Sequence, residues 1–398
     1  MPCIRDLLLE HRSEFENYDL LKRQVESGYN GAEINLGLYY LLIGNNEKLA
    51  YYWFFKVANH GDEWGMFWVG FCLRKGIGAS VNYIEAEKYL SPLAESGNIH
   101  AQYILGDMYL EMETDKTESG ITLLTKAANA NQSDALIRLG DCYCEGIYFD
   151  VDYSRSFSFY KSAADLGDAD AMARVGSAYY DGEGVAVNKA EALSWAKKSV
   201  ELGSRDGEFL LANYYEDEDN DMEKAIYWYT RAAEHGDDCA QYYLGFCYEN
   251  GEGVETDISK AIYWYTKAAD RGNAKSQCSL GDCYLNGIGV SPDPKKAHSY
   301  YILSAEQGNI LAQNTLATMY TVGNGVDVNY KTAAMWLTKA AEQGDSGSQR
   351  LLGKMYSMDL PGLPKDIKQA IYWLTKAINQ GHTEAQTELD ELMWGDLE

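Results

Sequence analysis

Apolar residues recur at intervals of three and four along most of the chain, which is the spacing of one face of an α-helix. In residues 237–272, a first run places Ala240, Leu244 and Tyr248 on one face. A second run has the same spacing in Ala261, Trp264, Tyr265, Ala268 and Ala269. Between them, the glycines of residues 250–254 permit the positive backbone angles of a turn. The pattern predicts a helical hairpin.

This hairpin is repeated through the chain, because a glycine follows each second helix at intervals of 33 to 37 residues. The glycines are Gly28, Gly61, Gly97, Gly167, Gly203, Gly236, Gly272, Gly308, Gly344 and Gly381. Asn131 fills the one gap in this series. Both residue types tolerate the left-handed conformation that ends a helix. The series predicts ten tandem units after an amino-terminal helix.

The unit resembles the Sel-1-like repeat, a relative of the tetratricopeptide repeat, in its Ala, Leu-Gly, Tyr, Gly-x-Gly, Lys-Ala, Trp-Tyr and Lys-Ala-Ala positions. The likeness is strongest in residues 237–308 and extends from about residue 30 to 381. Residues 98–131 lack the Gly-x-Gly turn, and residues 204–236 replace it with an acidic run. The resemblance implies an all-α fold, a right-handed α-solenoid superhelix of about ten helix-turn-helix repeats.

Three segments follow from this organisation. Residues 29–381 are expected to form the repeat solenoid. The ends of such an array need polar caps, because a terminal repeat has a neighbour on one side only. We expect a capping helix within residues 1–28 and a second capping helix within residues 382–398.

The charge of the chain is strongly acidic, with 34 Lys and Arg against 60 Asp and Glu, a net charge of −26. Such a field repels nucleic acid and anionic membrane surfaces, whose binding depends on basic side chains. A basic protein partner is favoured instead. The chain begins without the long apolar core of a signal peptide and has no apolar run long enough for a bilayer. We therefore expect a cytoplasmic protein, of undetermined oligomeric state.

The positions of the cysteines indicate core packing rather than disulfide formation or metal binding. Cys72, Cys142, Cys247 and Cys283 share one slot in the first helix, which Met or Ala fills in other units. A slot that accepts all three residue types is an apolar packing site. Some secreted proteins of the resembled family join successive repeats by disulfides, but Ala233 stands opposite Cys239 where that pairing would need a second cysteine. We expect no metal and no cofactor.

The remaining candidate chemistry is also explained by the repeat. Six tryptophans share one slot in the second helix, which indicates core packing: Trp53, Trp195, Trp228, Trp264, Trp336 and Trp373. The Gly-x-Gly turns follow helices and lack the wider spacing of phosphate loops. Neither a Gly-x-Ser-x-Gly elbow nor a His-Glu-x-x-His pair occurs. We expect no catalytic residues and a protein that is not an enzyme.

Two positions of the first helix, one on each side of the Leu or Val, are expected to face solvent and to contact a partner. Their chemistry varies from unit to unit, and large aromatic and arginine side chains are common anchors of protein interfaces. The predicted partner-binding residues are Trp68, Phe71, Asp107, Arg138, Asp141, Arg174, Asn213, Tyr243, Phe246 and Asp282. The resemblance implies that first helices line a concave groove. A solvated face without a partner is the alternative.

These observations favour a non-enzymatic scaffold or adaptor that holds a protein partner in its groove. The resemblance also covers bacterial immunity proteins that neutralise a cognate secreted toxin, which is the preferred specific alternative. A hydrolase is the remaining alternative, and it lacks a recognisable nucleophile and base.

Overall fold

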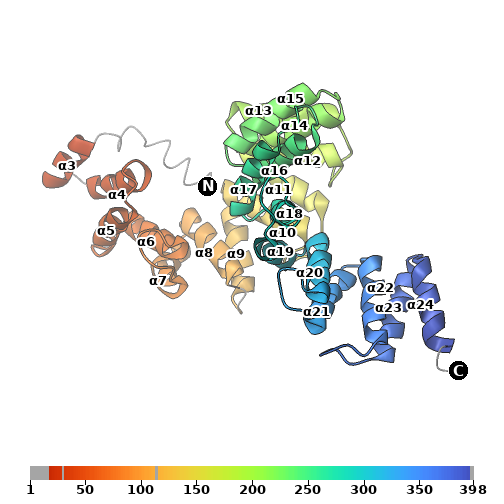
Figure 1. Ribbon diagram of the computed structural model, residues 1–398. Helices are drawn as coiled ribbons and strands as arrows, with labels where there is room; N and C mark the ends of the chain where they lie inside the picture. The colour runs from red at the N-terminus through yellow and green to blue at the C-terminus, as the bar shows by residue number, and fades with distance from the viewer. Residues whose placement is uncertain (1–17, 29–30, 113–114, 395–398) are drawn as a thin grey trace. The chain divides into compact units, whose positions relative to one another are not determined.

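The computed structural model describes residues 18–28, 31–112 and 115–394 (Figure 1). Within these residues the chain forms 22 helices and no strand, so the predicted all-α repeat fold is confirmed. The chain divides into two compact units, Met1–Leu210 and Leu211–Glu398. We call them unit 1 and unit 2 and describe each by itself.

The helices of unit 1 are separated by short turns. They are α3 (Tyr18–Glu26), α4 (Ala32–Leu42), α5 (Glu47–Ala58), α6 (Glu63–Lys75), α7 (Tyr83–Glu95), α8 (Ile99–Glu111), α9 (Thr117–Asn129), α10 (Ser133–Glu145), α11 (Tyr153–Asp165), α12 (Ala169–Asp181) and α13 (Lys189–Glu201). From α4 onwards, even-numbered helices are the first helices of repeats and odd-numbered helices are the second. The boundary between the units falls within α14 (Arg205–Asp217).

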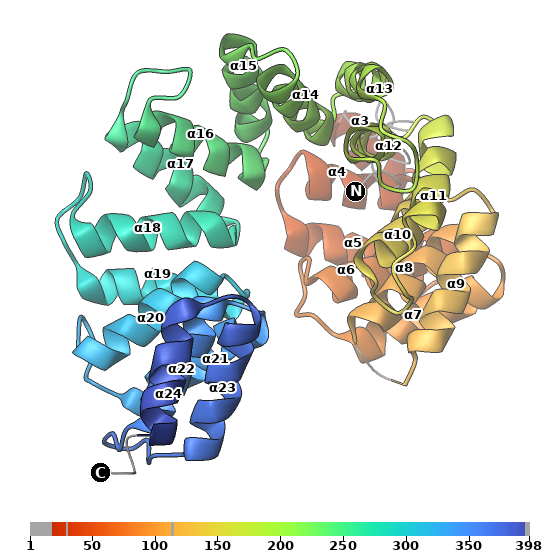
Figure 2. The ribbon, with the colours of Figure 1, turned by 90° about the vertical axis from the view of Figure 1, so that its right-hand side faces the viewer.

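Unit 2 continues the same alternation of first and second helices. Its further helices are α15 (Met222–Glu234), α16 (Asp238–Asn250), α17 (Ile258–Asp270), α18 (Ala274–Asn286), α19 (Pro294–Glu306), α20 (Ile310–Val322), α21 (Tyr330–Glu342), α22 (Ser346–Ser357), α23 (Ile367–Asn379) and α24 (Thr383–Trp394). From α15 to α24, each helix packs against the next in chain order, as α16 to α19 show in Figure 2. The hairpins therefore stack lengthwise.

Local sequence determines where these helices begin and end. Asp257 precedes α17, and its Oδ1 accepts a hydrogen bond from the Lys260 backbone N–H at 3.0 Å, which satisfies one free donor of the first turn. At the other end of a helix, Gly251 terminates α16 with a φ of 77°. Asn131 also has a positive φ, 61°, as expected of the residue that replaces glycine in the series between repeats.

The core lies where the two helices of a hairpin cross. Leu244 on α16 and Ala261 on α17 are both buried. A Cβ atom placed on Gly245 would lie 2.5 Å from ring atoms of Tyr265, so only glycine allows this close approach. The repeat position that the sequence reserves for glycine is therefore a packing requirement of the hairpin.

The cysteine and tryptophan slots also contribute to the core. Cys72, Cys142, Cys247 and Cys283 are all buried, as predicted. Burial raises the pKa of the Cys72 thiol to about 12. In the second helices, Trp195, Trp336 and Trp373 are buried, while the other three tryptophans of the slot are half-buried. Core packing therefore explains the cysteine slot, and it explains the tryptophan slot where the indole is buried.

The predicted end caps are only partly within the described residues. Residues 1–17 of the expected amino-terminal cap lie outside them, and α3 packs against α4. At the other end, α24 packs on α23 through buried Ala385. The proposed division into two caps and a solenoid stays a prediction. In the described part of the chain each helix has at most 13 residues, and none is long and apolar enough to cross a membrane.

Candidate protein-binding surface

The predicted binding positions divide into a buried group and a partly exposed group. Trp68 and Phe71 on α6 are only 2% and 3% exposed, so the prediction that they face solvent is wrong. Every other residue of the predicted set is half-buried, except Phe246, which is 36% exposed. The two positions therefore do not form one continuous solvent-facing surface.

Contacts with the preceding helix explain the burial of Trp68. It lies four residues before buried Cys72, about 40° away around α6, but Tyr243 has the same spacing from buried Cys247 and is only half-buried. The Trp68 ring stacks on Phe54 of α5, with centroids 5.3 Å apart and planes inclined by 18°. The side chain therefore belongs to the seam between α5 and α6 and is unavailable to a partner.

Phe71 is buried beside Trp68. Its ring meets Trp68 edge to face at 5.7 Å, and it belongs to the same apolar cluster as Ile104 and Met108 of α8. Large side chains of one repeat and the next fill the space that was expected to be solvent. We therefore exclude both aromatics from the candidate surface.

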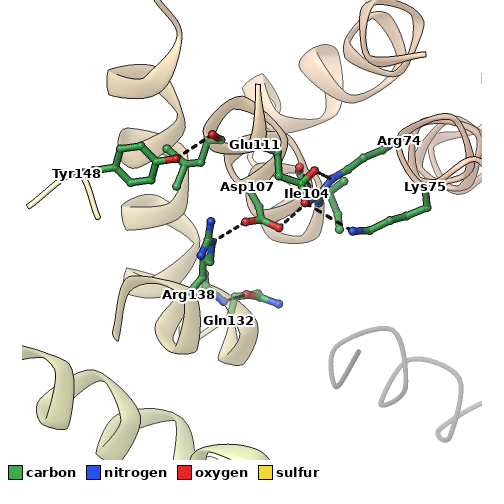
Figure 3. A network of polar contacts seen from close by, with 10 residues as sticks. Arg74, Lys75, Ile104, Asp107, Glu111, Gln132, Arg138 and Tyr148 are labelled. Carbon is green, nitrogen blue, oxygen red and sulfur yellow. Dashed lines mark hydrogen bonds and ion pairs between the residues drawn. The ribbon is translucent and has the colours of Figure 1, made fainter. Parts of the chain in front are cut away.

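Asp107 and Arg138 lie in a charged network that connects three successive first helices of unit 1 (Figure 3). Asp107 on α8 accepts hydrogen bonds from Arg138 Nε of α10 at 2.7 Å and from Arg74 Nη2 of α6 at 2.5 Å. Glu111 Oε1, one turn after Asp107, lies 2.7 Å from Arg74 Nη2. The carboxylate of Asp107 thus bridges two arginines from different repeats.

Arg74 is the residue of this network that sequence reasoning missed. Its side chain is 1% exposed, and its Nη1 donates to the Ile104 carbonyl oxygen at 3.2 Å. A buried guanidinium is tolerated only when paired and hydrogen bonded, and here two carboxylates and a carbonyl surround it. The available signal was the pair Asp107 and Glu111, whose spacing of four places two carboxylates on one helix face.

A second ionic contact joins the next repeats of unit 1. Arg174 Nη1 on α12 lies 2.9 Å from Asp141 Oδ1 on α10. The same Asp141 oxygen accepts a hydrogen bond from the Tyr160 hydroxyl at 2.7 Å. The pairing again joins the position before the Leu or Val in one repeat to the position after it in the preceding repeat. In unit 1, these variable positions therefore link neighbouring repeats.

The corresponding positions of unit 2 are more accessible. Tyr243 on α16 stacks on Tyr229 of α15 at 5.5 Å, which leaves it half-buried. Asn213 accepts a hydrogen bond from the Tyr229 hydroxyl at 2.7 Å, and Asp282 accepts one from the Tyr301 hydroxyl at 2.6 Å. Phe246 remains the most accessible aromatic of the predicted set.

Burial perturbs the pKa of some titratable groups of the predicted set. It raises the pKa of Asp282 above its usual range, although the hydrogen bond from Tyr301 opposes the shift. The described residues contain no group of three or more His, Cys, Asp and Glu side chains placed to hold a metal ion. The chemistry that this surface offers is apolar and hydrogen-bonding contact with another molecule.

Comparison with protein families matches the Sel1 repeat model ten times in succession. The matched segments are residues 31–62, 65–98, 99–132, 133–168, 169–204, 206–237, 240–273, 274–309, 310–345 and 346–382. They include the two weak copies of the sequence pattern. No curated protein matches the chain in sequence.

Solved structures include similar chains. A protective antigen of uropathogenic Escherichia coli with an SLR fold is 31% identical, with a TM-score of 0.53, over 94% of this chain and 82% of that one. A Sel1 repeat protein from Oxalobacter formigenes is 29% identical, with a TM-score of 0.53, over 77% and 90%. Immunity protein Pa5087 from Pseudomonas aeruginosa is 21% identical, with a TM-score of 0.42, over 53% of this chain and 81% of that one.

Proposed function

Because the chain belongs to the Sel1 repeat family, we propose that it is a non-enzymatic scaffold that binds a protein partner along its first helices. The observation that carries the proposal is the succession of ten repeats. Sel1 repeats typically mediate protein–protein interaction, and their fold is generally an interaction scaffold without catalysis. A stacked array offers an extended surface whose residues vary from repeat to repeat.

The proposed contact surface is centred on α16 in unit 2. Phe246 supplies an exposed apolar ring, and half-buried Tyr243 lies on the same helix. An aromatic side chain that is held by neighbouring rings can bind with little loss of side-chain freedom. The accessible edges of Asn213 and Asp282 provide polar contacts on the flanking first helices. In unit 1, Asp107, Arg138, Asp141 and Arg174 contribute through the exposed parts of their ion pairs.

The partner proposed for this surface is a basic protein. The net charge of −26 accelerates encounter with a positively charged molecule and disfavours nucleic acid and anionic lipid. A cytoplasmic location is part of the same proposal. Association should slow as ionic strength rises, because salt screens long-range attraction. An association rate that is independent of salt would contradict this part of the proposal.

The experiment is capture of partners from native lysate by wild type and by Phe246→Ala, with quantitative mass spectrometry. Thr318→Ala is the matched control, because Thr318 is exposed at the same repeat position on α20. We expect one enriched protein that Phe246→Ala retains poorly and Thr318→Ala retains fully. Equal retention by all three proteins would contradict the proposed surface.

Toxin neutralisation stays a prediction. The named immunity protein shares only the fold with this chain, so it adds no argument for that specific function. Hydrolysis also remains untested, and turnover by the purified protein would be its direct measurement.

A further inference from the structure

A row of exposed large side chains runs along the second helices of unit 2. The row occupies the position directly before the tryptophan slot, and its members are Tyr227 on α15, Tyr263 on α17, Met335 on α21 and Tyr372 on α23. Their exposed fractions are 55%, 53%, 45% and 49%. Ser299 interrupts the row on α19. These side chains are not needed to fill the core.

The same position in unit 1 shows that the repeat does not require an aromatic there. Exposed Thr122, Ser158 and Ser194 occupy it on α9, α11 and α13. A small hydroxyl side chain therefore suffices for the hairpin to pack. Unit 1 carries one exposed tyrosine at this position, Tyr52 on α5, whereas unit 2 carries three. Exposed tyrosines that recur at one repeat position are a feature of interaction surfaces, in which Tyr is enriched.

A basic side chain lies four residues after each member of the row. The Lys267 ammonium lies 5.7 Å from the centroid of the Tyr263 ring, and the Lys376 ammonium lies 4.9 Å from that of Tyr372. Such cation–π contacts hold an exposed lysine beside its ring. We call this surface the tyrosine–lysine stripe. It comprises Tyr227, Arg231, Tyr263, Lys267, Met335, Lys339, Tyr372 and Lys376.

Charge is distributed unevenly between the two sets of helices in unit 2. The second helices α15, α17, α19, α21 and α23 carry ten Lys and Arg residues and five Asp and Glu residues. The first helices α16, α18, α20, α22 and the last helix α24 carry three basic and seven acidic residues. In a chain of net charge −26, the second helices of unit 2 thus carry an excess of basic residues.

We propose that the tyrosine–lysine stripe docks an acidic protein segment in which carboxylates alternate with apolar side chains. The carboxylates pair with Lys267, Lys376 and their counterparts, while the apolar side chains pack on the tyrosine rings. The helical positions match this chemistry, because each ring and its cation are one turn apart. The proposal concerns a different face and a partner of opposite charge from the proposed function, so either can fail alone.

An acidic protein fits this surface better than a nucleic acid does. Five carboxylates interrupt the basic residues of these helices, which disfavours a continuous row of phosphates. Single carboxylates on a peptide can pair with one lysine at a time. The two classes of ligand are distinguished in the test.

The test measures binding of a fluorescent peptide in which glutamate and phenylalanine alternate, using the full chain. Two comparison probes are a glutamate–serine peptide and a single-stranded oligonucleotide of equal length. We expect the glutamate–phenylalanine peptide to bind at least about tenfold more tightly than either of them, because it alone offers both contacts. Equal or tighter binding of the glutamate–serine peptide or of the oligonucleotide would overturn the proposal.

The variant Y227S/Y263S/Y372S installs the serine that α11 and α13 already carry. We expect it to remain folded by circular dichroism and to weaken peptide binding about tenfold or more. The double variant K267Q/K376Q keeps the rings and should weaken binding and reduce its salt dependence. Tyr52→Ser is the matched control in unit 1, because Tyr52 occupies the same position on α5 and its Lys56 is already paired with Glu33 at 2.8 Å. Unchanged binding in both multiple variants would refute the docking role.

Discussion

The first helices α6 and α16 place aromatics at the same two repeat positions, yet they use them differently. On α6, Trp68 and Phe71 are sealed within the apolar core, whereas on α16 Tyr243 is half-buried and Phe246 is exposed. The helical register is identical, so register alone does not set exposure. What differs is the neighbours, because Trp68 stacks on Phe54 and Tyr243 stacks on Tyr229. On α6 of unit 1, the side chains at these positions pack against neighbouring helices, whereas on α16 of unit 2 they stay partly accessible to solvent.

The largest expected effect comes from Trp68→Ala. It removes a buried indole that stacks on Phe54, and substitutions of this kind cost about 3–5 kcal/mol because they leave a cavity. Tyr243→Ala should cost clearly less, because its side chain is half-buried. Denaturant unfolding monitored by circular dichroism measures both. Equal destabilisation by the two substitutions would contradict the contrast between α6 and α16.

Arg74→Ala should have the next largest effect. It leaves Asp107 and Glu111 without their shared guanidinium, and removal of one partner of a buried ion pair costs about 3 kcal/mol or more. Lys88→Ala is the control, because Lys88 pairs with Glu85 at 2.6 Å while 66% exposed. If Arg74→Ala unfolded at the same midpoint denaturant concentration as wild type, the network would not stabilise the contact between repeats.

Tyr301→Phe probes the hydrogen bond from Tyr301 to Asp282 in unit 2, which corresponds to the hydrogen bond from Tyr160 to Asp141 in unit 1. It removes the hydroxyl that donates to Asp282 and leaves a half-buried carboxylate without that donor, which costs about 1–3 kcal/mol. Urea unfolding of the variant and of Tyr52→Phe, whose ring is exposed, gives the comparison. A loss no greater than that of Tyr52→Phe would show that the hydrogen bond contributes nothing.

The pH dependence of Asp282 gives a smaller effect with a definite sign. Burial raises its pKa in the folded protein above the value in the unfolded chain. The folded state therefore binds the proton more tightly, and stability falls as pH rises from the unfolded pKa through the folded pKa. Asp282→Asn should lack this contribution. The difference in unfolding free energy between wild type and variant, measured at several pH values in the acidic range, should change in that direction.

Phe246→Ala should change stability least, by under about 1 kcal/mol, because the ring is more than one third exposed. Its expected effect is on partner capture. Thermal unfolding of this variant beside wild type checks that any loss of binding is not loss of folding. A large drop in midpoint temperature would show that Phe246 supports the core, as Trp68 does.

The repeat architecture was predictable because a few positions satisfy strict local requirements. Gly245 is needed for the approach of Tyr265, and Leu244 and Cys247 on the same helix are buried. Helix ends were likewise predictable from Gly251 and Asn131, since left-handed backbone restricts residue choice. Such features depend on residues within one hairpin or on its immediate boundary.

The candidate surface was less predictable because it depends on contacts between repeats. The network of Arg74 joins residues 33 and 37 positions apart, and no local spacing encodes which arginine meets which carboxylate. The burial of Trp68 depends on its stacking with Phe54 in the preceding helix. The expectation that these positions face solvent considered each first helix alone. In a stacked array, side-chain volume in the adjacent repeats decides which of them reach solvent.

Hydroxyl-radical footprinting of side chains, with and without a captured basic partner, tests the central claim most directly. In the free protein, we expect radicals to oxidise Phe246 and to leave Trp68 unmodified. Partner binding should then protect Phe246 without changing Trp68. Ready oxidation of Trp68 in the folded free protein, or unchanged oxidation of Phe246 in the complex, would contradict the account.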